Sequence, residues 1–333
     1  MHLIEVTKKF ATKESCLDYL ASLRWPSGVY CLKCGITDKD ENGRDYIAKF
    51  TTNETTRTRF SKRKKKVVTV KVPSRSLYEC RACGYQFSAT TGTVFHDSHL
   101  PIETWFQAVA MILEAKKGMS ALQVCRHLGI EKKNYKPIWY LCHRIREATK
   151  ETGLLTGEVE ADETFLTPRK PRKGKPYVKK EKNDVVLGMR QRDGQLRLVP
   201  VQDAKMDIIG PVLSEHISPD VETIYTDDAA TYAIYLGRNF PGKHKIINHT
   251  RHFVSGRTHT QHIENAFSLL KRGVYGTFHK VSIKHLGRYC NEFSFRFNRR
   301  ASQGQMFEET VKGLLNGKPL TYKALTASET VEP

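Results

Sequence analysis

The stretch Glu158-Val159-Glu160-Ala161-Asp162-Glu163 alternates in character with every residue. Successive side chains of a β-strand point to opposite faces, so this pattern predicts a strand with two distinct sides. One side carries Val159, Ala161 and Glu163, and the other carries Glu158, Glu160 and Asp162. The second side makes this strand the first place to look for carboxylate chemistry.

Downstream of this strand, the sequence predicts further strands and helices. Residues 184–190 and 195–201 favour a hairpin, because Asp193-Gly194 between them suits a tight turn. We expect a helix near residues 205–216 and a strand over 221–225 that ends at Thr226-Asp227-Asp228. Helices return at His262 and continue to the region of Met306.

Asp162, Asp227 and Glu264 are candidate ligands of catalytic metal ions, on a strand, at a strand end and in the first turn of a helix. Cutting DNA requires an activated water or hydroxyl and neutralised charge on the attacking and leaving oxygens. Two divalent ions a few ångströms apart supply both. Mg²⁺ prefers oxygen ligands and keeps several waters, so two or three carboxylates are sufficient.

Each of these carboxylates also has an ordinary structural explanation. Asp at a strand end commonly caps a turn, and Glu at a helix start favours the positive end of the helix dipole. Glu160 competes with Asp162 on the same strand face, and Asp228 competes with Asp227. Spacing alone leaves these alternatives open.

Upstream of the strand, two helices joined at a glycine turn predict a helix-turn-helix. Apolar residues recur at helical spacing from Ile102 to Leu113, Ser120 to Gln123 has the form of a capping box, and Gly129 ends that helix. Another helix is marked by apolar residues from Ile138 to Ile145. Its region is basic, and the candidate DNA contacts are Lys132, Lys133, His143 and Arg144.

Two matched cysteine pairs predict one structural zinc site. They are Cys31-Leu32-Lys33-Cys34-Gly35 and Cys80-Arg81-Ala82-Cys83-Gly84. Two intervening residues let both sulfurs of a tight turn point at one ion, and the following Gly permits the positive φ that such a turn often needs. Four unrelated buried thiols are the alternative, and His96 and His99 are rival ligands.

The 45 residues between the two pairs hold a basic insertion. Residues 57–66 are expected to form a basic loop that leads into a strand over 67–72. The candidate DNA contacts of this loop are Lys62, Arg63, Lys64, Lys65 and Lys66.

The chain as a whole is strongly basic. Its 333 residues include 55 Lys and Arg and 35 Asp and Glu, giving a net charge of +20. That excess favours a polyanionic partner, because phosphates neutralised by Lys or Arg release counterions, although ribosomal, histone-like and membrane-surface proteins share it. We see neither a membrane-spanning stretch nor a signal-peptide pattern, so we expect a cytoplasmic protein.

Several segments resemble bacterial insertion-sequence transposases, in the order of that family. Residues 85–95 are similar to the end of its zinc-ribbon domain, and residues 117–123 and 143–148 to its helix-turn-helix. Residues 159–165, Thr226-Asp227 and residues 262–299 resemble its DDE catalytic domain. The group is insertion-sequence family 1595, the ISXO type, which is related to eukaryotic Merlin transposases.

The resemblance implies a multidomain α+β protein. Residues 1–98 would form a zinc ribbon with the basic insertion, and residues 99–150 a helix-turn-helix. Residues 151–318 would form an RNase H-like α/β catalytic domain with a central mixed sheet, followed by a C-terminal tail over 319–333. The long insertion departs from the family, as do the Lys- and Pro-rich residues 170–182, which replace a Gly-rich stretch.

The resemblance also implies which acidic residues act. It selects Asp162 over Glu160 and Asp227 over Asp228, since Asp227 and Glu264 enclose 36 residues, as in the family. It implies that Lys271, two helical turns after Glu264, binds a phosphate of the DNA, and that Arg272 also contacts DNA. The alternative for Lys271 is an ordinary solvated surface lysine.

Glu292, Arg296 and Arg299 match a Glu/Arg pattern that lies near the active site in the family. The resemblance implies that they support that site. An ion-paired helix packed by its aromatic residues explains the same pattern.

The implied activity is cleavage and joining of DNA by two Mg²⁺ (or Mn²⁺) ions on Asp162, Asp227 and Glu264, with one structural Zn²⁺ elsewhere. The implied partners are the terminal inverted repeats of the element and target DNA, near the bacterial nucleoid, and no membrane. Joining two ends requires at least a homodimer in a synaptic complex. The alternatives are a regulator that binds DNA without cutting it and a nuclease that cuts without joining.

Overall fold

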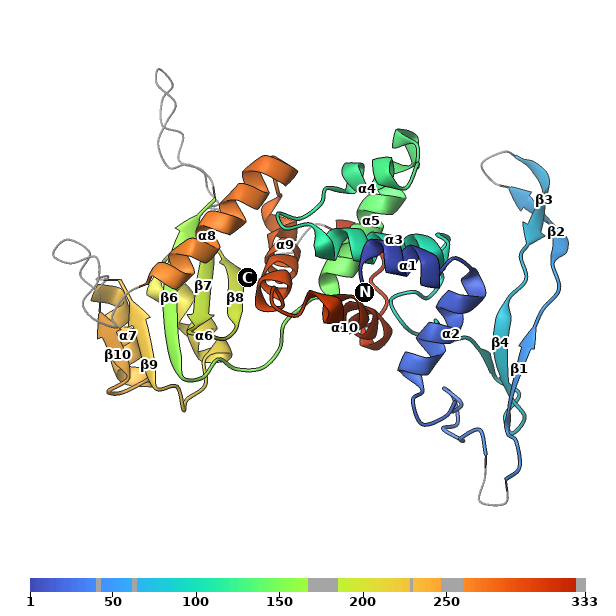
Figure 1. The fold of residues 1–333 in the computed structure, drawn as a ribbon, viewed down its shortest axis with the longest axis horizontal. Coiled ribbons are helices and arrows are strands. Elements are labelled where there is room, and N and C mark those ends of the chain that lie inside the picture. Colours follow the sequence, from blue (N-terminus) through green and yellow to red (C-terminus); the bar gives the residue numbers. More distant parts are fainter. Residues whose placement is uncertain (40–42, 62–64, 167–184, 228–229, 247–259, 328–333) are drawn as a thin grey trace. The chain divides into compact units, whose positions relative to one another are not determined.

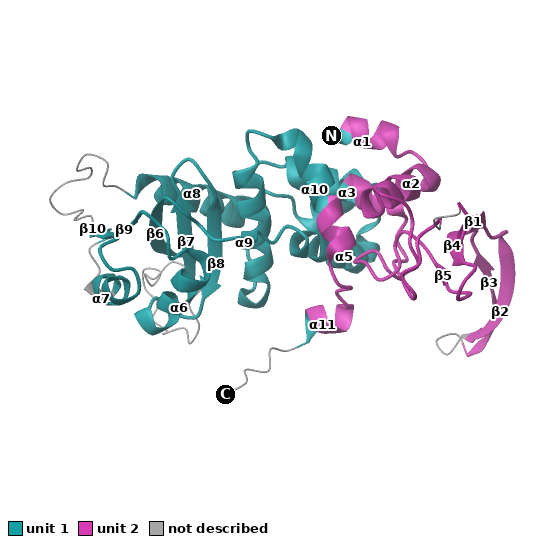
Figure 2. Ribbon diagram, turned by 90° about the horizontal axis from the view of Figure 1, so that it is seen from below, with its two compact units in different colours: residues 1–3, 108–310, 326–333 teal, residues 4–107, 311–325 magenta. Residues whose placement is uncertain are grey.

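The computed structural model of the chain describes residues 1–39, 43–61, 65–166, 185–227, 230–246 and 260–327. The chain divides into two compact units, coloured separately in Figure 2. The cysteine unit holds residues 4–107 and 311–325, and the sheet unit holds residues 1–3, 108–310 and 326–333. The domain boundaries expected near residues 98 and 150 stay a prediction. None of the described helices combines the length and the apolar character needed to cross a membrane.

Two helices begin the cysteine unit, α1 (Leu3–Lys9) and α2 (Lys13–Arg24). Thr12 starts α2 with a reciprocal cap: its hydroxyl accepts the Ser15 N–H at 3.2 Å, and the Ser15 hydroxyl accepts the Thr12 N–H at 3.4 Å. The buried face of α2 presents Cys16 and Leu20. These helices precede the cysteine pairs and were not expected from the sequence.

The strands of the cysteine unit form a sheet and a separate hairpin. The sheet has the order β1 (Ile47–Thr51), β4 (Ser76–Cys80), β5 (Gln86–Phe87), all antiparallel. The hairpin pairs β2 (Thr55–Ser61) with β3 (Lys66–Val72). The strand expected over 67–72 is confirmed.

The loop expected over residues 57–66 is wrong in its first part. Arg57 and Arg59 lie within β2, opposite Val70 and Val68 of β3. Thr and Arg alternate along β2, and β-branched residues of β3 lie opposite the arginines. Such cross-strand pairs stabilise a hairpin, so this segment forms a strand rather than a loop. Residues 62–64 lie outside the described residues, whereas Lys65 and Lys66 are described and exposed.

The sheet unit begins within α3 (Ile102–Glu114), and α4 (Ala121–His127), a 3₁₀ turn η1 (Lys132–Asn134) and α5 (Tyr135–Glu147) follow. The Ser120 hydroxyl caps α4 by accepting the Gln123 N–H at 3.2 Å. Gly129 turns the chain after α4 with a φ of 64°. The expected pair of helices is therefore present, and its action as a DNA-binding helix-turn-helix stays a prediction.

A five-stranded mixed sheet is the centre of this unit (Figure 1). Its order is β10 (His244–Ile246), β9 (Thr223–Thr226), β6 (Glu158–Phe165), β7 (Val185–Gln191), β8 (Leu196–Val201). β10, β9 and β6 are parallel, whereas β7 and β8 form the expected antiparallel hairpin. The predicted central mixed sheet is confirmed.

Helices cover both faces of the sheet. On one face, Val159 and Ala161 of β6 belong to a core with α6 (Met206–His216) and α7 (Ala230–Asn239). On the other, Val186 of β7 packs with α8 (Gln261–Gly273) and α9 (Ile283–Asn298). A π-helical turn η2 (Val274–Phe278) follows α8, and α10 (Gln303–Asn316) and α11 (Tyr322–Thr326) complete the described chain.

Candidate active site

Asp162 lies within β6, and Asp227 directly follows β9, the neighbouring parallel strand; the end of the sheet where they lie is called its edge below. β6 and β9 run parallel, with Glu160 paired to Tyr225. Two residues further along each strand lie Asp162 and Asp227, so continuation of this register places them side by side. Both are half-buried. The sequence predicted Asp162 on a strand and Asp227 at a strand end, and the parallel register of β6 and β9 accounts for their proximity.

Helix α8 brings Glu264 to this edge. Gly188 lies directly opposite Asp162 in the pairing of β6 with β7. A Cβ added at Gly188 would come within 2.6 Å of both Ile263 and Phe267, so α8 rests on the bare backbone of β7 at this point. Only glycine allows such a close approach of a helix to a strand. Glu264, adjacent to Ile263, is exposed.

The electrostatics of Asp162 show that these acidic groups lie near one another. Burial raises the pKa of its carboxyl to about 7, assisted by the negative charges of Glu163, Asp227 and Glu264. A hydrogen bond from the Glu163 N–H at 2.8 Å opposes this rise in pKa. Carboxylates that repel one another in a half-buried site are stabilised by a bound cation.

Glu163 and Tyr232 belong to this cluster and were not anticipated. The Tyr232 hydroxyl, on α7, donates to Glu163 at 2.7 Å. Burial raises the pKa of Tyr232, and the charges of Glu163, Asp162 and Asp227 raise it further. The neighbouring carboxylate was visible in the sequence, but nothing there indicated that α7 would place a phenol beside it.

The three candidate carboxylates do not surround a single ion-sized point. Within the described parts of the chain, one group of three or more possible ligands has its atoms within 4.8 Å of one another, and it consists of cysteines. Two Mg²⁺ ions about 4 Å apart, each about 2 Å from its ligands, can join oxygens up to about 8 Å apart. A wider spread of carboxylates is therefore compatible with two ions, and their metal-binding role stays a prediction.

The cysteine group consists of the four residues expected from their spacing. Cys31 and Cys83 place their sulfurs 3.6 Å apart, and Cys34 and Cys80 place theirs 3.7 Å apart. Sulfurs at the corners of a zinc tetrahedron, each about 2.3 Å from the ion, are about 3.8 Å apart. The four thiols thus form a cluster that can hold zinc, and His96 and His99 are outside it.

The backbone of this cluster favours ionised sulfur. Gly35 and Gly84 have φ angles of 77° and 67°, as the tight turns after the second cysteines require. Burial raises the pKa of Cys31, but hydrogen bonds from the Cys34 and Lys33 N–H groups and from neighbouring thiols lower it to about 6. The pKa of Cys83 is raised to about 12 and that of Cys34 is also raised, in both cases against backbone hydrogen bonds, by burial and by contacts with the other thiols, so Cys31 is the first of these three thiols to ionise to the form that binds metal.

One comparison with known proteins concerns a part of the sheet unit. Residues 154–298 match the family model described as the ISXO2-like transposase domain. The match runs from just before β6 to the last residue of α9, so it contains the sheet and all three candidate carboxylates. Residues 154–298, called the transposase domain below, are therefore similar to this family.

A second comparison extends beyond the transposase domain. The chain is 22% identical over 304 residues to an uncharacterized protein in transposable element ISH50 of Halobacterium salinarum. That alignment covers 87% of this chain and 92% of the relative. The resemblance to insertion-sequence transposases is confirmed.

The basic residues expected to contact DNA differ in accessibility. Lys132 and Lys133 on η1 are exposed, as is Arg272 in the last turn of α8 in the transposase domain, and Lys271 beside it is half-buried. His143 is fully buried, and burial, followed by the charge of Arg146, lowers its pKa to about 2.

Arg144 is also buried, with an exposed fraction of 5%. Neither His143 nor Arg144 can reach a phosphate from the interior, because a contact with DNA requires a side chain at the surface. We therefore leave both residues out of the proposed DNA interface.

Glu292 and Arg296 of the transposase domain lie in an ion-pair network with Arg146. Glu292 pairs with Arg146 at 2.6 Å and with Arg296 at 3.1 Å, and all three side chains are buried. Arg296 also donates to the backbone oxygens of Ala115 and Lys116. These contacts join α9 to α5 and to the loop after α3.

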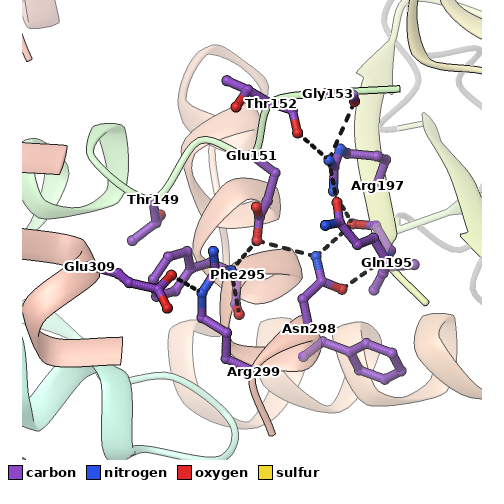
Figure 3. Close-up of polar contacts among 12 residues, drawn as sticks. Thr149, Glu151, Thr152, Gly153, Gln195, Arg197, Phe295, Asn298, Arg299 and Glu309 are labelled. Atoms are coloured by element: carbon purple, nitrogen blue, oxygen red, sulfur yellow. Dashed lines mark hydrogen bonds and ion pairs between the residues drawn. The ribbon is translucent and has the colours of Figure 1, made fainter. Parts of the chain in front are cut away.

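Residues at the end of α9 contact Glu151, in the segment that leads into the sheet (Figure 3). Arg299 forms ion pairs with Glu151 and Glu309, and Asn298 donates to Glu151 at 3.2 Å. The Asn298 amide also bonds the backbone of Leu196 in β8, accepting its N–H at 2.7 Å and donating to its oxygen at 3.2 Å. These contacts join the end of α9 to Glu151, to Glu309 and to β8, and support of the active site by Glu292, Arg296 and Arg299 stays a prediction.

Proposed function

We propose that this protein binds the terminal inverted repeats of an insertion sequence, cleaves DNA there and joins the freed ends to target DNA. The observation that carries the proposal is the cluster at the edge of β6 and β9. There the charges of Asp227 and Glu264 act on the half-buried carboxyl of Asp162, inside an ISXO2-like transposase domain. In a chain of net charge +20, acidic side chains gathered at one edge of a sheet call for a cationic ligand.

The residues of this site suit phosphodiester chemistry. Held by Asp162, Asp227 and Glu264, two Mg²⁺ or Mn²⁺ ions would activate water and neutralise charge on the attacking and leaving oxygens. Lys271 follows Glu264 by two turns of α8, so it lies on the same helix face and would hold a backbone phosphate. The released 3′-hydroxyl would then attack a phosphodiester of target DNA, forming the new P–O bond as the bond from that phosphorus to the target's own 3′-oxygen breaks, and no covalent bond between protein and DNA is required.

The remaining parts of the chain would recognise DNA and assemble the complex. The α4–α5 helix pair would act as a helix-turn-helix, with the exposed Lys132 and Lys133 on phosphates. The four cysteines would hold one structural zinc ion, and Lys65 and Lys66 of the hairpin would add contacts with DNA. Two element ends must be held together, so a homodimer is the smallest assembly. An RNase H-like fold of the catalytic domain is supported by the mixed sheet with helices on both faces.

The decisive experiment is a cleavage and joining assay on DNA that carries the repeats flanking the gene. Wild-type protein should cut the element ends in the presence of Mg²⁺ or Mn²⁺, and it should join a precut 3′-hydroxyl end to a plasmid. Asp162→Asn and Asp227→Asn should retain binding to the ends and lose both reactions, because each substitution removes a metal ligand but leaves the basic surfaces intact.

Two results would contradict the proposal. Specific binding without any metal-dependent cutting would indicate a regulator. Cutting without joined products would indicate a nuclease.

A further inference from the structure

Helix α8 begins without a cap from its own residues. Thr260 occupies the N-cap position, but its side chain makes no capping hydrogen bond. Its hydroxyl donates instead to Glu264 at 3.1 Å. The first N–H groups of a helix have no partner within the helix, so the start of α8 requires acceptors from elsewhere in the fold.

Glu160 of β6 supplies these acceptors from a distant part of the chain. Its side chain is fully buried, and one carboxylate oxygen accepts the N–H of His262 at 3.0 Å and of Ile263 at 3.1 Å. The other oxygen accepts from Arg192 at 3.0 Å and lies 3.3 Å from the His262 ring. A carboxylate at this position also interacts favourably with the positive end of the helix dipole.

The two anchors of α8 lie beside Asp162. Glu160 shares a face of β6 with Asp162, two residues away, and holds the N-terminus of α8. Gly188 lies opposite Asp162 in β7 and receives Ile263 and Phe267 of the same helix. Glu264 directly follows Ile263, whose N–H Glu160 binds. The position of Glu264 relative to Asp162 is thus determined at two adjacent points of the sheet.

We propose that Glu160 is a positioning residue of the catalytic site, which fixes Glu264 against Asp162 by holding the start of α8. This inference rests on the proposed function, since it assigns Glu264 and Asp162 to one metal site. Glu160 itself does not bind the metal: its carboxylate is engaged by α8 and Arg192. Supporting residues of this kind affect metal affinity by about 10–100-fold when they are replaced.

The test is calorimetric binding of Mn²⁺ by the full-length protein, compared between Glu160→Gln and Glu158→Gln. Glu158 is a matched control: it lies on the same face of β6, pairs with the same Arg192 at 3.5 Å and accepts from Tyr225 at 2.7 Å. Mn²⁺ prefers oxygen ligands, so the thiols contribute little to the signal. Glu160→Gln should weaken Mn²⁺ binding by at least about tenfold, and Glu158→Gln should leave it within about twofold of wild type.

Amide hydrogen exchange adds a local readout. In Glu160→Gln, the N–H groups of His262 and Ile263 should exchange faster than in Glu158→Gln, because the acceptor that holds them is weaker. Gly188→Ala is a second variant for the case in which Glu160→Gln does not fold. Its added methyl group would overlap the Ile263 and Phe267 side chains that rest on Gly188, so it should disturb the seat of α8 and also weaken Mn²⁺ binding.

The possible failures are distinguishable. If Glu160→Gln folds and binds Mn²⁺ as tightly as Glu158→Gln, the positioning role is refuted. If Glu160→Gln does not fold, the same conclusion follows when Gly188→Ala binds Mn²⁺ as tightly as Glu158→Gln. If wild-type protein shows no Mn²⁺ binding that Asp162→Asn abolishes, the proposed function itself fails, and this inference fails with it.

Discussion

Arg146 of α5 donates to Glu292 of α9 at 2.6 Å, and both side chains are 1% exposed. Glu292 also pairs with Arg296, so one buried carboxylate serves two buried guanidinium groups. The helix proposed to read DNA and a helix of the transposase domain are therefore joined through the interior of a single compact unit.

Replacing Glu292 should destabilise the protein strongly. Glu292→Gln leaves two buried positive charges without compensation, and breaking a buried ion pair in this way costs about 3–5 kcal/mol. The free energy of unfolding, measured by urea titration, should fall by that amount. The matched control is Glu147→Gln, which breaks a pair with Arg288 that is partly exposed and should cost less than about 1 kcal/mol. Equal losses in the two variants would show that the buried network is not important for stability.

Zinc should be present at one ion per chain and depend on the cysteine cluster. Cys34→Ser removes one of four thiolates, so elemental analysis of the purified variant should show loss of zinc and a lower melting temperature. Cys125→Ser alters a buried thiol outside the cluster and should retain the metal. Zinc retained by Cys34→Ser at the wild-type level would mean that the metal lies elsewhere.

The metal-free protein should lose stability as pH rises through neutrality. The pKa of Asp162 is raised in the folded state from 3.8 to about 7, so the folded chain holds this proton more tightly than the unfolded chain. The resulting stability is present below about pH 4 and is lost as pH rises through 7. Asp162→Asn removes this penalty and should stabilise metal-free protein at about pH 8 by up to about 4 kcal/mol, with little effect at pH 4.

Thermal unfolding at both pH values measures this effect. Added Mg²⁺ should raise the melting temperature of wild type at pH 8 but not that of Asp162→Asn, since the ion stabilises the same carboxylate. A difference in stability between wild type and Asp162→Asn that is the same at pH 4 and at pH 8 would mean that Asp162 does not titrate near neutrality.

DNA binding should depend on salt through the exposed lysines of η1. Replacing both Lys132 and Lys133 by Gln should reduce the slope of log affinity against log salt by about 1–2, because Lys133 is already paired with Glu131. A double replacement of Lys205 and Lys243 by Gln changes the net charge equally, outside the proposed interface, and should leave the slope unchanged. Equal reductions in the two double variants would indicate a response to overall charge alone.

Patterns that extend over a few neighbouring residues predicted much of the fold. Alternation along β6, the Asp-Gly turn between β7 and β8 and the glycines after the cysteines each act within a few residues, and each prediction was confirmed. The cap on α2 is also local, in Thr12 and Ser15, and could have been read from the sequence.

Long-range contacts could not be predicted in the same way. The partners of Glu160 are backbone N–H groups about a hundred residues away, and such groups carry no signature in the sequence. The sequence does not distinguish a Glu160 that is buried for structural reasons from a Glu160 that binds metal. The choice of Asp162 over Glu160 therefore depended on the family resemblance. The burial of His143 and Arg144 was missed because helical spacing indicates faces but not which neighbours cover them.

The amide of Asn298 has a consequence for assembly. It occupies both the N–H and the carbonyl oxygen of Leu196, on the outer strand of the sheet. Unpaired groups along an outer strand invite strands from other molecules, and here one side chain terminates the hydrogen-bond ladder. Strand pairing with another molecule through β8 is therefore blocked at Leu196, whether that molecule is a second copy of this chain or part of an aggregate.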